Sequence, residues 1–459
     1  MLIAFDKLIL IRNIAFDYLI ILMYLGRNID KELLLWKREI GRKPLLVRGA
    51  RQVGKSSSIR KLGEKFDTFL EINFEEHKSV HSLFKGSLTP QVLCENLSIM
   101  FDTEIIPGKT LLFFDEIQAC IPAISSLRFF YEKMPELHVV AAGSLLEFAL
   151  AEIPSFGVGR IRSIYMYPLS FDEFLLGLGH GKLLEAKRKA DRQNPLVIPI
   201  HEKLLDLLKK FLIIGGMPEV IEKYASQNDL RGCQRVLDDL IVSLRTDFAK
   251  YKDKIPSSRI REVFESVVSQ SGGKFVYTNA SQKFNIHQIK ETLELLIMAG
   301  LVIPVTHTSA NGIPLGAEVN PKKRKMLLLD TGIFQRLMQL DISELLFSED
   351  FNLVNIGGIA EQFVGLEILK NSSCYNQTEL FYWHREALNS NAEVDYIIQK
   401  QNDIVPVEVK SGKKGSMNSM FLFLHEKKAK YGCRLSLENF AEYKNIKVYP
   451  LYAVNNCLR

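Results

Sequence analysis

Short apolar runs alternate with helical stretches over the first part of the chain. The runs lie at 45–49, 69–74, 110–116 and 138–144, and a fifth begins at 163 and stops at Pro168. Buried strands that are separated by helices are typical of a parallel sheet with helices on both faces. The pattern therefore predicts an α/β domain over 28–200. An amphipathic helix at 28–41 opens it, in which Ile29, Leu33, Trp36 and Ile40 recur at helical spacing.

The pattern becomes helical after residue 200. Residues 201–255 read as helices with a break at "GGMPE" (215–219), and the polar stretch 180–200 reads as an inserted arm or loop. A helix at 259–270, a turn, a helix at about 285–298 and an apolar strand after Gly300 follow in the order of a winged helix. We therefore expect a helical and winged-helix region over 201–340, with a basic loop at 321–325.

A further α/β unit is expected over 341–459. Its predicted elements are a helix at 357–370, strands near 379–384, 392–399 and 404–410, a helix at 417–430 and a last strand at 446–454. Residues 1–27 form an N-terminal extension. Its apolar run is interrupted by Arg12 and Asp17 and falls short of the roughly 20 residues that span a bilayer, so no membrane segment is expected. It is either a docked helix or sequence translated upstream of a start at Met23.

Composition agrees with a folded protein of several domains. The 459 residues exceed what one core accommodates, and 47% are hydrophobic and 24% charged. The net charge of +6 permits an acidic partner without requiring one. The six cysteines form no CxxC pair, which favours a cytoplasmic protein with reduced thiols and no zinc site.

A phosphate-binding loop lies between the first predicted strand and the next helix. "GARQVGKSS" fits GxxxxGK[ST] in the strand–loop–helix context that the motif requires. Backbone N–H groups and the helix N-terminus would hold the phosphates of ATP, Lys55 would reach the β- and γ-phosphates, and Ser56 would ligate Mg²⁺. The loop comprises Gly49, Ala50, Arg51, Gln52, Val53, Gly54, Lys55, Ser56 and Ser57.

Acids and a serine at the ends of later strands complete this candidate site. "LLFFDE" delivers Asp115, expected to hold the Mg²⁺, and Glu116, expected to polarise the attacking water. Ser144 is either a polar sensor of the γ-phosphate or a helix cap. Arg160 and Arg162 could reach the γ-phosphate of a neighbouring subunit, which would need a homo-oligomer, or they are structural arginines.

The predicted hairpin at 392–410 carries a second set of acids. Strand alternation places Glu393 and Asp395 on one face, with Val394 and Tyr396 on the other. In an aligned register Asp395, Glu408 and Lys410 converge. Two carboxylates can bind Mg²⁺ or Mn²⁺, and a lysine beside them can activate water. The alternative is an ordinary half-exposed charged hairpin.

Several motifs together resemble a prokaryotic family of AAA+-type ATPases. They are "PLLVRGARQVGKSS", "EINFEE", "TLLFFDEIQ", "AAGSLLEFAL", "VGRI" with "YPLSFDEFL", and "IGGMPEV". In that family a P-loop domain is followed by a winged helix and a nuclease-like domain of unknown function, and the resemblance covers the chain from about residue 27. Ser56 stands where threonine is commoner.

The D…ExK order of the hairpin resembles the PD-(D/E)XK nuclease superfamily, although "EVD" replaces the proline-aspartate pair. This resemblance implies catalytic roles for Asp395, Glu408 and Lys410, and for Glu361 on the preceding helix. We therefore expect an ATP-hydrolysing protein that acts on DNA through a metal-dependent nuclease domain. Residues 396–434 hold eight Lys and Arg against three acids, an excess that could attract a phosphate backbone or belong to a solvated helix face. The alternative is a non-cleaving ATP-switched regulator whose last domain only binds nucleic acid or a protein partner.

Overall fold

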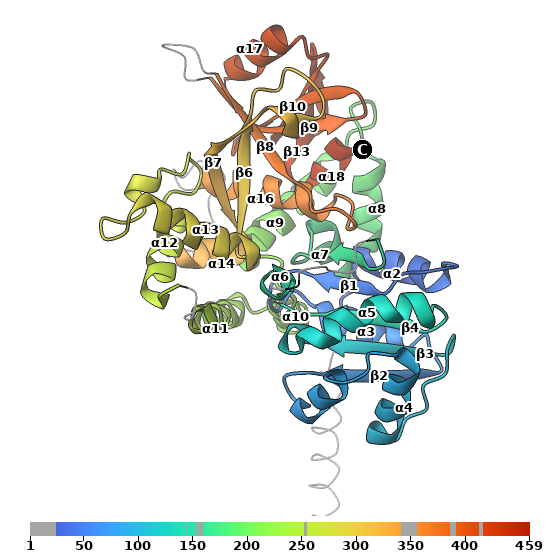
Figure 1. Cartoon of the computed structure of the whole chain (residues 1–459). Helices are drawn as coiled ribbons and strands as arrows, with labels where there is room; N and C mark the ends of the chain where they lie inside the picture. The colour runs from blue at the N-terminus through green and yellow to red at the C-terminus, as the bar shows by residue number, and fades with distance from the viewer. Residues whose placement is uncertain are drawn as a thin grey trace, which may run out of the picture.

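A computed structural model shows two β-sheets at opposite ends of the molecule with helices between them (Figure 1). It describes residues 24–144, 146–151, 153, 159–251, 255–340, 356–385, 392–412 and 416–459. The expectations for residues 1–23 lie outside this described part. No helix within it is long and apolar enough to cross a membrane.

The first sheet confirms the predicted α/β domain. Its five strands pair in the order β2-β3-β4-β1-β5, and all neighbours are parallel. Successive residues of the strands pack into two different apolar clusters, one on each face of the sheet. Phe113, for example, belongs to one cluster and Phe114 to the other. That burial on both faces explains the continuous apolar runs. The strands are β1 (Leu45–Arg48), β2 (Thr68–Asn73), β3 (Thr110–Asp115), β4 (His138–Ala142) and β5 (Arg162–Tyr165).

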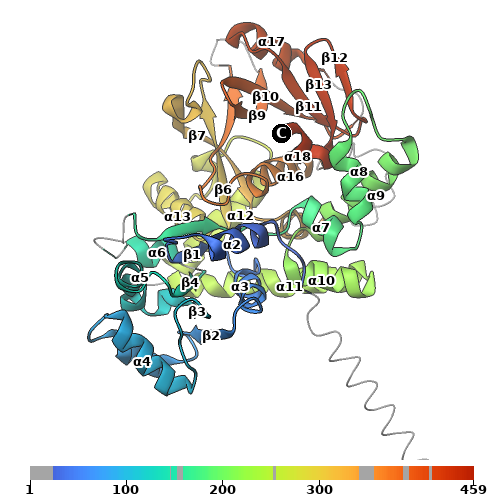
Figure 2. The ribbon, with the colours of Figure 1, turned by 90° about the vertical axis from the view of Figure 1, so that its right-hand side faces the viewer.

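Helices cover both faces of this sheet (Figure 2). They are α2 (Asn28–Arg38), α3 (Lys55–Gly63), α4 (Pro90–Phe101), α5 (Ile121–Lys133) and α6 (Leu146–Ala151). α2 buries Ile29, Leu33 and Trp36, as the helical spacing predicted. Ile40 is 98% exposed, because the helix ends two residues before it.

A helical region follows the first sheet. It contains α7 (Phe171–Gly177), α8 (Gly181–Lys189), α9 (Ile198–Ile214), α10 (Pro218–Gln227) and α11 (Leu230–Asp247). The stretch 180–200 is therefore mostly helical, and the expectation of an arm or loop is wrong there. Its Lys187 is buried against the carboxylate of Asp172, an ion pair that sequence spacing does not reveal.

The break between α9 and α10 is held by a buried aspartate. Asp330 accepts a hydrogen bond from Gly216 N at 2.6 Å through one oxygen and from Gly332 N at 2.8 Å through the other. Gly332 lies in the first turn of α14 (Thr331–Leu337). One carboxylate thus joins the "GGMPE" turn to an element more than a hundred residues later in the chain.

The next elements appear in the order helix, short 3₁₀ turn, helix and hairpin. They are α12 (Ser257–Ser269), η4 (Tyr277–Asn279), α13 (Ile286–Met298), β6 (Val302–Thr308) and β7 (Val319–Leu328). Residues 321–325, expected as a basic loop, lie within β7. The last of them, Lys325, is only 2% exposed.

The second sheet has eight strands in the order β12-β13-β11-β10-β9-β8-β6-β7. It contains the β6–β7 hairpin, because β6 pairs in parallel with β8. The sheet therefore runs across the boundary at 340/341 that the sequence pattern suggested. The remaining strands are β8 (Leu380–His384), β9 (Glu393–Lys400), β10 (Asp403–Val409), β11 (Gly432–Ser436), β12 (Ala441–Tyr443) and β13 (Ile446–Pro450).

Within the described residues, three helices accompany the second sheet: α16 (Ile356–Lys370), α17 (Asn418–Lys427) and α18 (Val454–Leu458). The helices predicted at 357–370 and 417–430 correspond to α16 and α17. β11 and β12 were not predicted, because "GCRLS" and "AEY" are too short and mixed to give a period-2 signal.

Candidate functional site

The loop 49–57 lies at the carboxyl end of β1 and leads into α3. Two glycines shape it. Gly54 has φ +94°, in the left-handed region, and a Cβ at Gly49 would lie 2.2 Å from the carbonyl oxygen of Met166. Only glycine fits such positions, so the backbone can fold closely around a bound group.

Lys55 is the first residue of α3 and its ammonium group lies inside the loop. Its Nζ donates hydrogen bonds to the carbonyl oxygens of Ala50 at 2.7 Å and Gly49 at 3.0 Å. Burial lowers the pKa of Lys55 to about 8, while the nearby carboxylates of Glu116 and Asp115 oppose that shift. The positive charge is thus held where the oxygens of a bound phosphate would meet it.

Ser56 and Asp115 are adjacent, as their expected shared role requires. Ser56 Oγ donates a hydrogen bond to Asp115 Oδ2 at 2.8 Å, and Asp115 Oδ1 accepts one from Glu116 N at 3.0 Å. Burial raises the pKa of Asp115, and the Ser56 hydrogen bond works against that rise. A hydroxyl beside a buried carboxylate matches the oxygen ligands that Mg²⁺ takes.

Glu116 and Ser144 lie at the ends of the neighbouring strands β3 and β4. Glu116 adopts a left-handed conformation with φ +48°. Its Oε2 accepts hydrogen bonds from Gln118 Nε2 at 2.5 Å and Ser144 Oγ at 3.5 Å. The hydroxyl of Ser144 thus reaches the carboxylate expected to act on water. Gln118 was not singled out in the sequence.

Arg51 connects the loop to the helical region. Its Nε donates to Ser144 Oγ at 3.1 Å, and its Nη1 binds Asp247 at the end of α11 at 2.7 and 2.9 Å. A second contact comes from Gly300 after α13, where an added Cβ would lie 3.4 Å from Ala50 N. No motif marks Asp247 or Gly300 as neighbours of the loop, and only the fold brings them there.

Arg162 begins β5, at the opposite end of the strands from the phosphate loop, and Arg160 precedes it by two residues. Arg162 pairs in register with Leu45, the first residue of β1, whereas the loop follows the last. Arg160 forms an ion pair with Glu132, and Arg162 Nη2 donates to Glu39 Oε1 at 2.8 Å. Glu132 and Glu39, the partners found here, both lie outside the phosphate loop.

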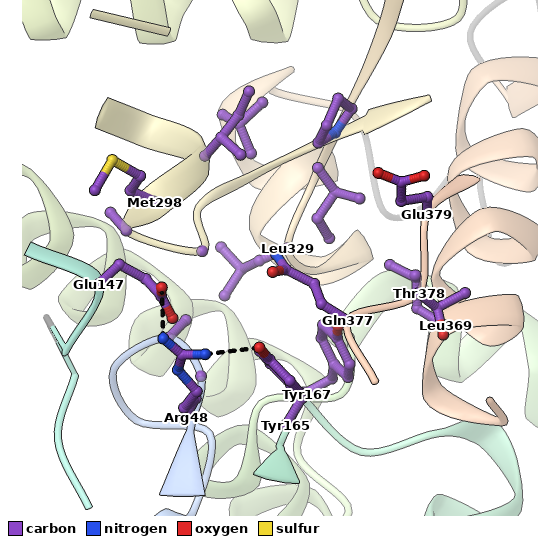
Figure 3. Close-up of a pocket in the computed structure, with 18 of the residues that line it drawn as sticks. Arg48, Glu147, Tyr165, Tyr167, Met298, Leu329, Leu369, Gln377, Thr378 and Glu379 are labelled. Atoms are coloured by element: carbon purple, nitrogen blue, oxygen red, sulfur yellow. Dashed lines mark hydrogen bonds and ion pairs between the residues drawn. The ribbon is translucent and has the colours of Figure 1, made fainter. Parts of the chain in front are cut away.

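A pocket of about 430 Å³ adjoins the loop where the two sheets approach each other (Figure 3). At its floor Arg48 binds Glu147 Oε2 at 2.8 Å and the hydroxyl of Tyr165 at 2.7 Å. Met298 at the end of α13 and Gln377 before β8 also line the pocket. The pocket beside the phosphate loop is therefore lined by residues that lie between positions 48 and 381 of the chain.

A β-bulge shapes the second candidate site. Phe381 pairs with Ile397 but Trp383 pairs with Val394, so Asp395 and Tyr396 together oppose one residue of β8. The strict alternation predicted for this strand is therefore wrong at Tyr396. Its hydroxyl donates to the carbonyl oxygen of Glu361 on α16 at 2.8 Å.

The acids of the hairpin converge with Glu361. Asp395 Oδ2 accepts a hydrogen bond from Val409 N at 2.8 Å, and Lys410 Nζ binds Glu408 Oε1 at 2.6 Å. Glu408 is 5% exposed, and its Oε2 is buried without a hydrogen-bond partner in the described part of the chain. Such an oxygen suits a cation. Asp395 Oδ1 and Glu408 Oε2 are thus oxygens that could hold a divalent ion.

A lysine that the sequence reasoning missed lies among these acids. Lys325 Nζ is 2.6 Å from Glu393 Oε1, 2.7 Å from Glu361 Oε1 and 3.9 Å from Asp395 Oδ1. Glu393, which strand alternation placed on the same face as Asp395, binds the same ammonium group. One signal in the sequence could have revealed Lys325: it directly precedes the apolar run of β7.

Burial and mutual repulsion govern these ionisations. Burial raises the pKa of Glu361 to about 7, against the attraction of Lys325. Burial and the charge of Asp395 raise the pKa of Glu408 to about 7. Within the described residues no three His, Cys, Asp or Glu side chains are already arranged around a metal position. The cluster carries more negative than positive charge and would be relieved by a cation.

Comparisons with known proteins assign the first part of the chain. A family model of an AAA domain matches residues 41–175, and models of two domains of unknown function match 205–344 and 356–454. No curated protein matches the chain. Residues 41–175 are thus an AAA-type P-loop ATPase domain.

Solved structures give distant likenesses. The Walker-type ATPase PABY2304 of Pyrococcus abyssi is 15% identical over 69% of this chain and 96% of its own, with a TM-score of 0.45. The Aeropyrum pernix ORC1 protein in complex with DNA is 10% identical over 70% and 96%, with a TM-score of 0.30. The PCH-2 protein of C. elegans is 14% identical over 47% and 60%, with a TM-score of 0.25.

Proposed function

We propose that this chain binds and hydrolyses ATP with Mg²⁺, and that the nucleotide changes how its later regions are arranged. The observation that carries the proposal is the 2.8 Å contact between Ser56 and Asp115 beside the loop-bound ammonium of Lys55. Together with the AAA-domain match, it supplies a hydroxyl, a carboxylate and a cation at the carboxyl end of a parallel sheet.

The chemistry follows from these groups. Phosphate oxygens would replace the two carbonyl oxygens that Lys55 now contacts, and an anion there favours the charged ammonium. Ser56 and Asp115 would hold the Mg²⁺, which neutralises charge on the phosphates. Glu116, oriented by Gln118 and Ser144, would position the attacking water.

Arg51 is the residue through which the nucleotide would reach the helical region. A γ-phosphate beside Ser144 would compete with Asp247 for its guanidinium group, since both are anions. Loosening that ion pair would free the end of α11. A homo-oligomer in which Arg160 meets a neighbour's phosphate remains a compatible arrangement.

Replacing Lys55 tests the nucleotide site. Lys55→Ala removes the cation for the phosphates, and we expect ATP hydrolysis to fall on the order of a hundredfold or more while the fold persists. The measurement is phosphate release, with circular dichroism as the check on folding. Lys61→Ala is the matched control, because Lys61 lies on the same helix but pairs with Glu64 at the surface. Wild-type turnover by a folded Lys55→Ala protein would refute the assignment.

Glu116→Gln separates hydrolysis from binding. The amide keeps the size of the side chain but cannot take a proton from water, so hydrolysis should fall roughly 10² to 10⁴-fold with ATP still bound. Binding is measured with a fluorescent ATP analogue and hydrolysis by phosphate release. If binding is lost together with hydrolysis, Glu116 is a structural residue of the loop.

For the C-terminal site we propose metal-dependent hydrolysis of phosphodiesters in DNA. Asp395 and Glu408 would hold the cation, and Lys410 would stabilise the charged phosphate. Support comes from Glu408 Oε2, which is buried without a hydrogen-bond partner in the described part of the chain, and from Asp395, whose charge acts on Glu408. A second candidate is a non-cleaving regulator. The ammonium group of Lys325 favours it, because the acids already have an internal counter-ion.

Metal binding at this site is tested on the full chain, since β6 and β7 belong to the same sheet. Without nucleotide, Mn²⁺ at a hundredfold excess over its Kd should stabilise the protein by about 2.7 kcal/mol. Asp395→Asn should remove the thermal shift and any Mn²⁺-dependent nicking of plasmid DNA. Asp403→Asn is the control, because Asp403 pairs with Lys430 at the surface of the same hairpin. A shift that persists in Asp395→Asn when Asp115→Asn has also removed the ligand of the ATPase site refutes the metal site, and a shift without nicking supports the regulator.

DNA binding is proposed for the α12–β7 region together with basic segments of the second sheet. The exposed side of α13 carries Lys290 but also Glu291 and Glu294, whose partners are Arg259 and Arg324. That helix alone offers little positive charge, so residues such as Lys322 on β7 and the lysines of 396–434 would supply most phosphate contacts.

Salt dependence tests this proposal. Each neutralised phosphate releases counter-ions, so duplex affinity should fall on the order of tenfold or more when salt rises from about 50 to about 200 mM. Fluorescence anisotropy with a labelled duplex measures it. Lys322→Glu should weaken binding, whereas Lys61→Glu on the first domain should not. An affinity that stays flat across this range would count against nucleic acid as the partner.

A further inference from the structure

Lys325 is a buried cation that comes from outside the hairpin it serves. It lies on β7, at the edge of the second sheet, and its side chain is 2% exposed. Its ammonium group contacts Glu393 at 2.6 Å and Glu361 at 2.7 Å, which approach from a strand and a helix. A lysine buried this deeply is retained only where carboxylates compensate the loss of hydration.

The charges of the cluster do not balance. When all are ionised, as a bound cation would favour, Glu361, Glu393, Asp395 and Glu408 contribute four negative charges, and Lys325 and Lys410 contribute two positive ones. The two charges left over equal one divalent cation. A second divalent ion would exceed those two charges.

The oxygen atoms divide in the same way. Lys325 forms ion pairs with Glu361 Oε1 and Glu393 Oε1, and Lys410 forms one with Glu408 Oε1. Val409 N donates a hydrogen bond to Asp395 Oδ2. Glu408 Oε2 has no hydrogen-bond partner in the described part of the chain. Asp395 Oδ1 lies 3.9 Å from Lys325 Nζ, which is beyond hydrogen-bond distance. These two oxygens belong to Asp395 and Glu408, the carboxylates that do not form the two shortest ion pairs of Lys325.

We propose that the C-terminal site takes a single divalent cation, between Asp395 and Glu408, and that Lys325 is the fixed counter-ion of its other half. Lys325 would stand where a two-metal site holds its second ion. This inference rests on the proposed metal site. Lys325 is then a positioning residue, which fixes Glu361 and Glu393 and limits the number of ions without touching the reacting phosphate.

The test counts Mn²⁺ ions. Electron paramagnetic resonance and calorimetric titration are run on nucleotide-free full chains that all carry Asp115→Asn, so that the ATPase site contributes no ligand. With Lys325 present we expect one Mn²⁺ per chain, lost in Asp395→Asn. Lys325→Met should bind a second Mn²⁺, because Glu361 and Glu393 are released. Lys322→Met is the control, because it removes a charge from an exposed position of the same strand. The Lys322→Met chain should bind one Mn²⁺ ion.

The outcomes distinguish this inference from the function on which it rests. If no Asp395-dependent Mn²⁺ binds to the chain with Lys325, the metal site itself fails. If one Mn²⁺ binds both with and without Lys325, only the counter-ion role fails. Two ions bound in the presence of Lys325 also overturn it. Should Lys325→Met not fold in chelator, Mn²⁺ should refold it with two ions per chain, and a failure of that rescue counts against the inference.

Discussion

The parallel pairing of β6 with β8 is the constraint on which the arrangement of both sites depends. Val305 pairs with Leu380, which joins the hairpin after α13 to the strands that carry the acidic cluster. Because of this pairing, Lys325 on β7 reaches Glu361 and Glu393. The same hairpin begins directly after Gly300, whose backbone lies against Ala50 of the phosphate loop. The backbone hydrogen bonds between β6 and β8 therefore join the segment that contacts the phosphate loop to the strands that carry the acids.

The two sites handle charge in similar ways. In each, a buried lysine is held by oxygen atoms of the chain: carbonyl oxygens for Lys55 and carboxylates for Lys325. Burial alone would lower the pKa of both groups. For Lys55 it prevails, and the pKa falls to about 8, whereas the carboxylates around Lys325 reverse the shift and raise its pKa. The first lysine is thus open to an anion from outside, and the second already has its anions within the fold.

Local patterns predicted much of the fold for identifiable reasons. The strands of the first sheet are buried on both faces and read as apolar runs, and α2 shows helical spacing up to Trp36. α8 was missed because its polar, basic residues resemble a loop, while a buried pair of Lys187 with Asp172 stabilises it. The face of Tyr396 was mispredicted because the bulge in β9 adds one residue that no strand period contains.

Sequence alone determined the phosphate loop, the strand-end acids and the AAA-type class of the first domain, because each depends on residues that are contiguous or follow a buried strand. It also determined that Asp395, Glu408 and Lys410 share a hairpin. Only the tertiary structure decided that Arg51 pairs with Asp247, that Arg160 pairs with Glu132, and that Lys325 pairs with Glu361 and Glu393. These contacts join residues separated by tens to hundreds of positions, and charge at such a distance along the chain leaves no periodic trace. Their partners are set by the order in which strands pair, and that order is a property of the packed chain.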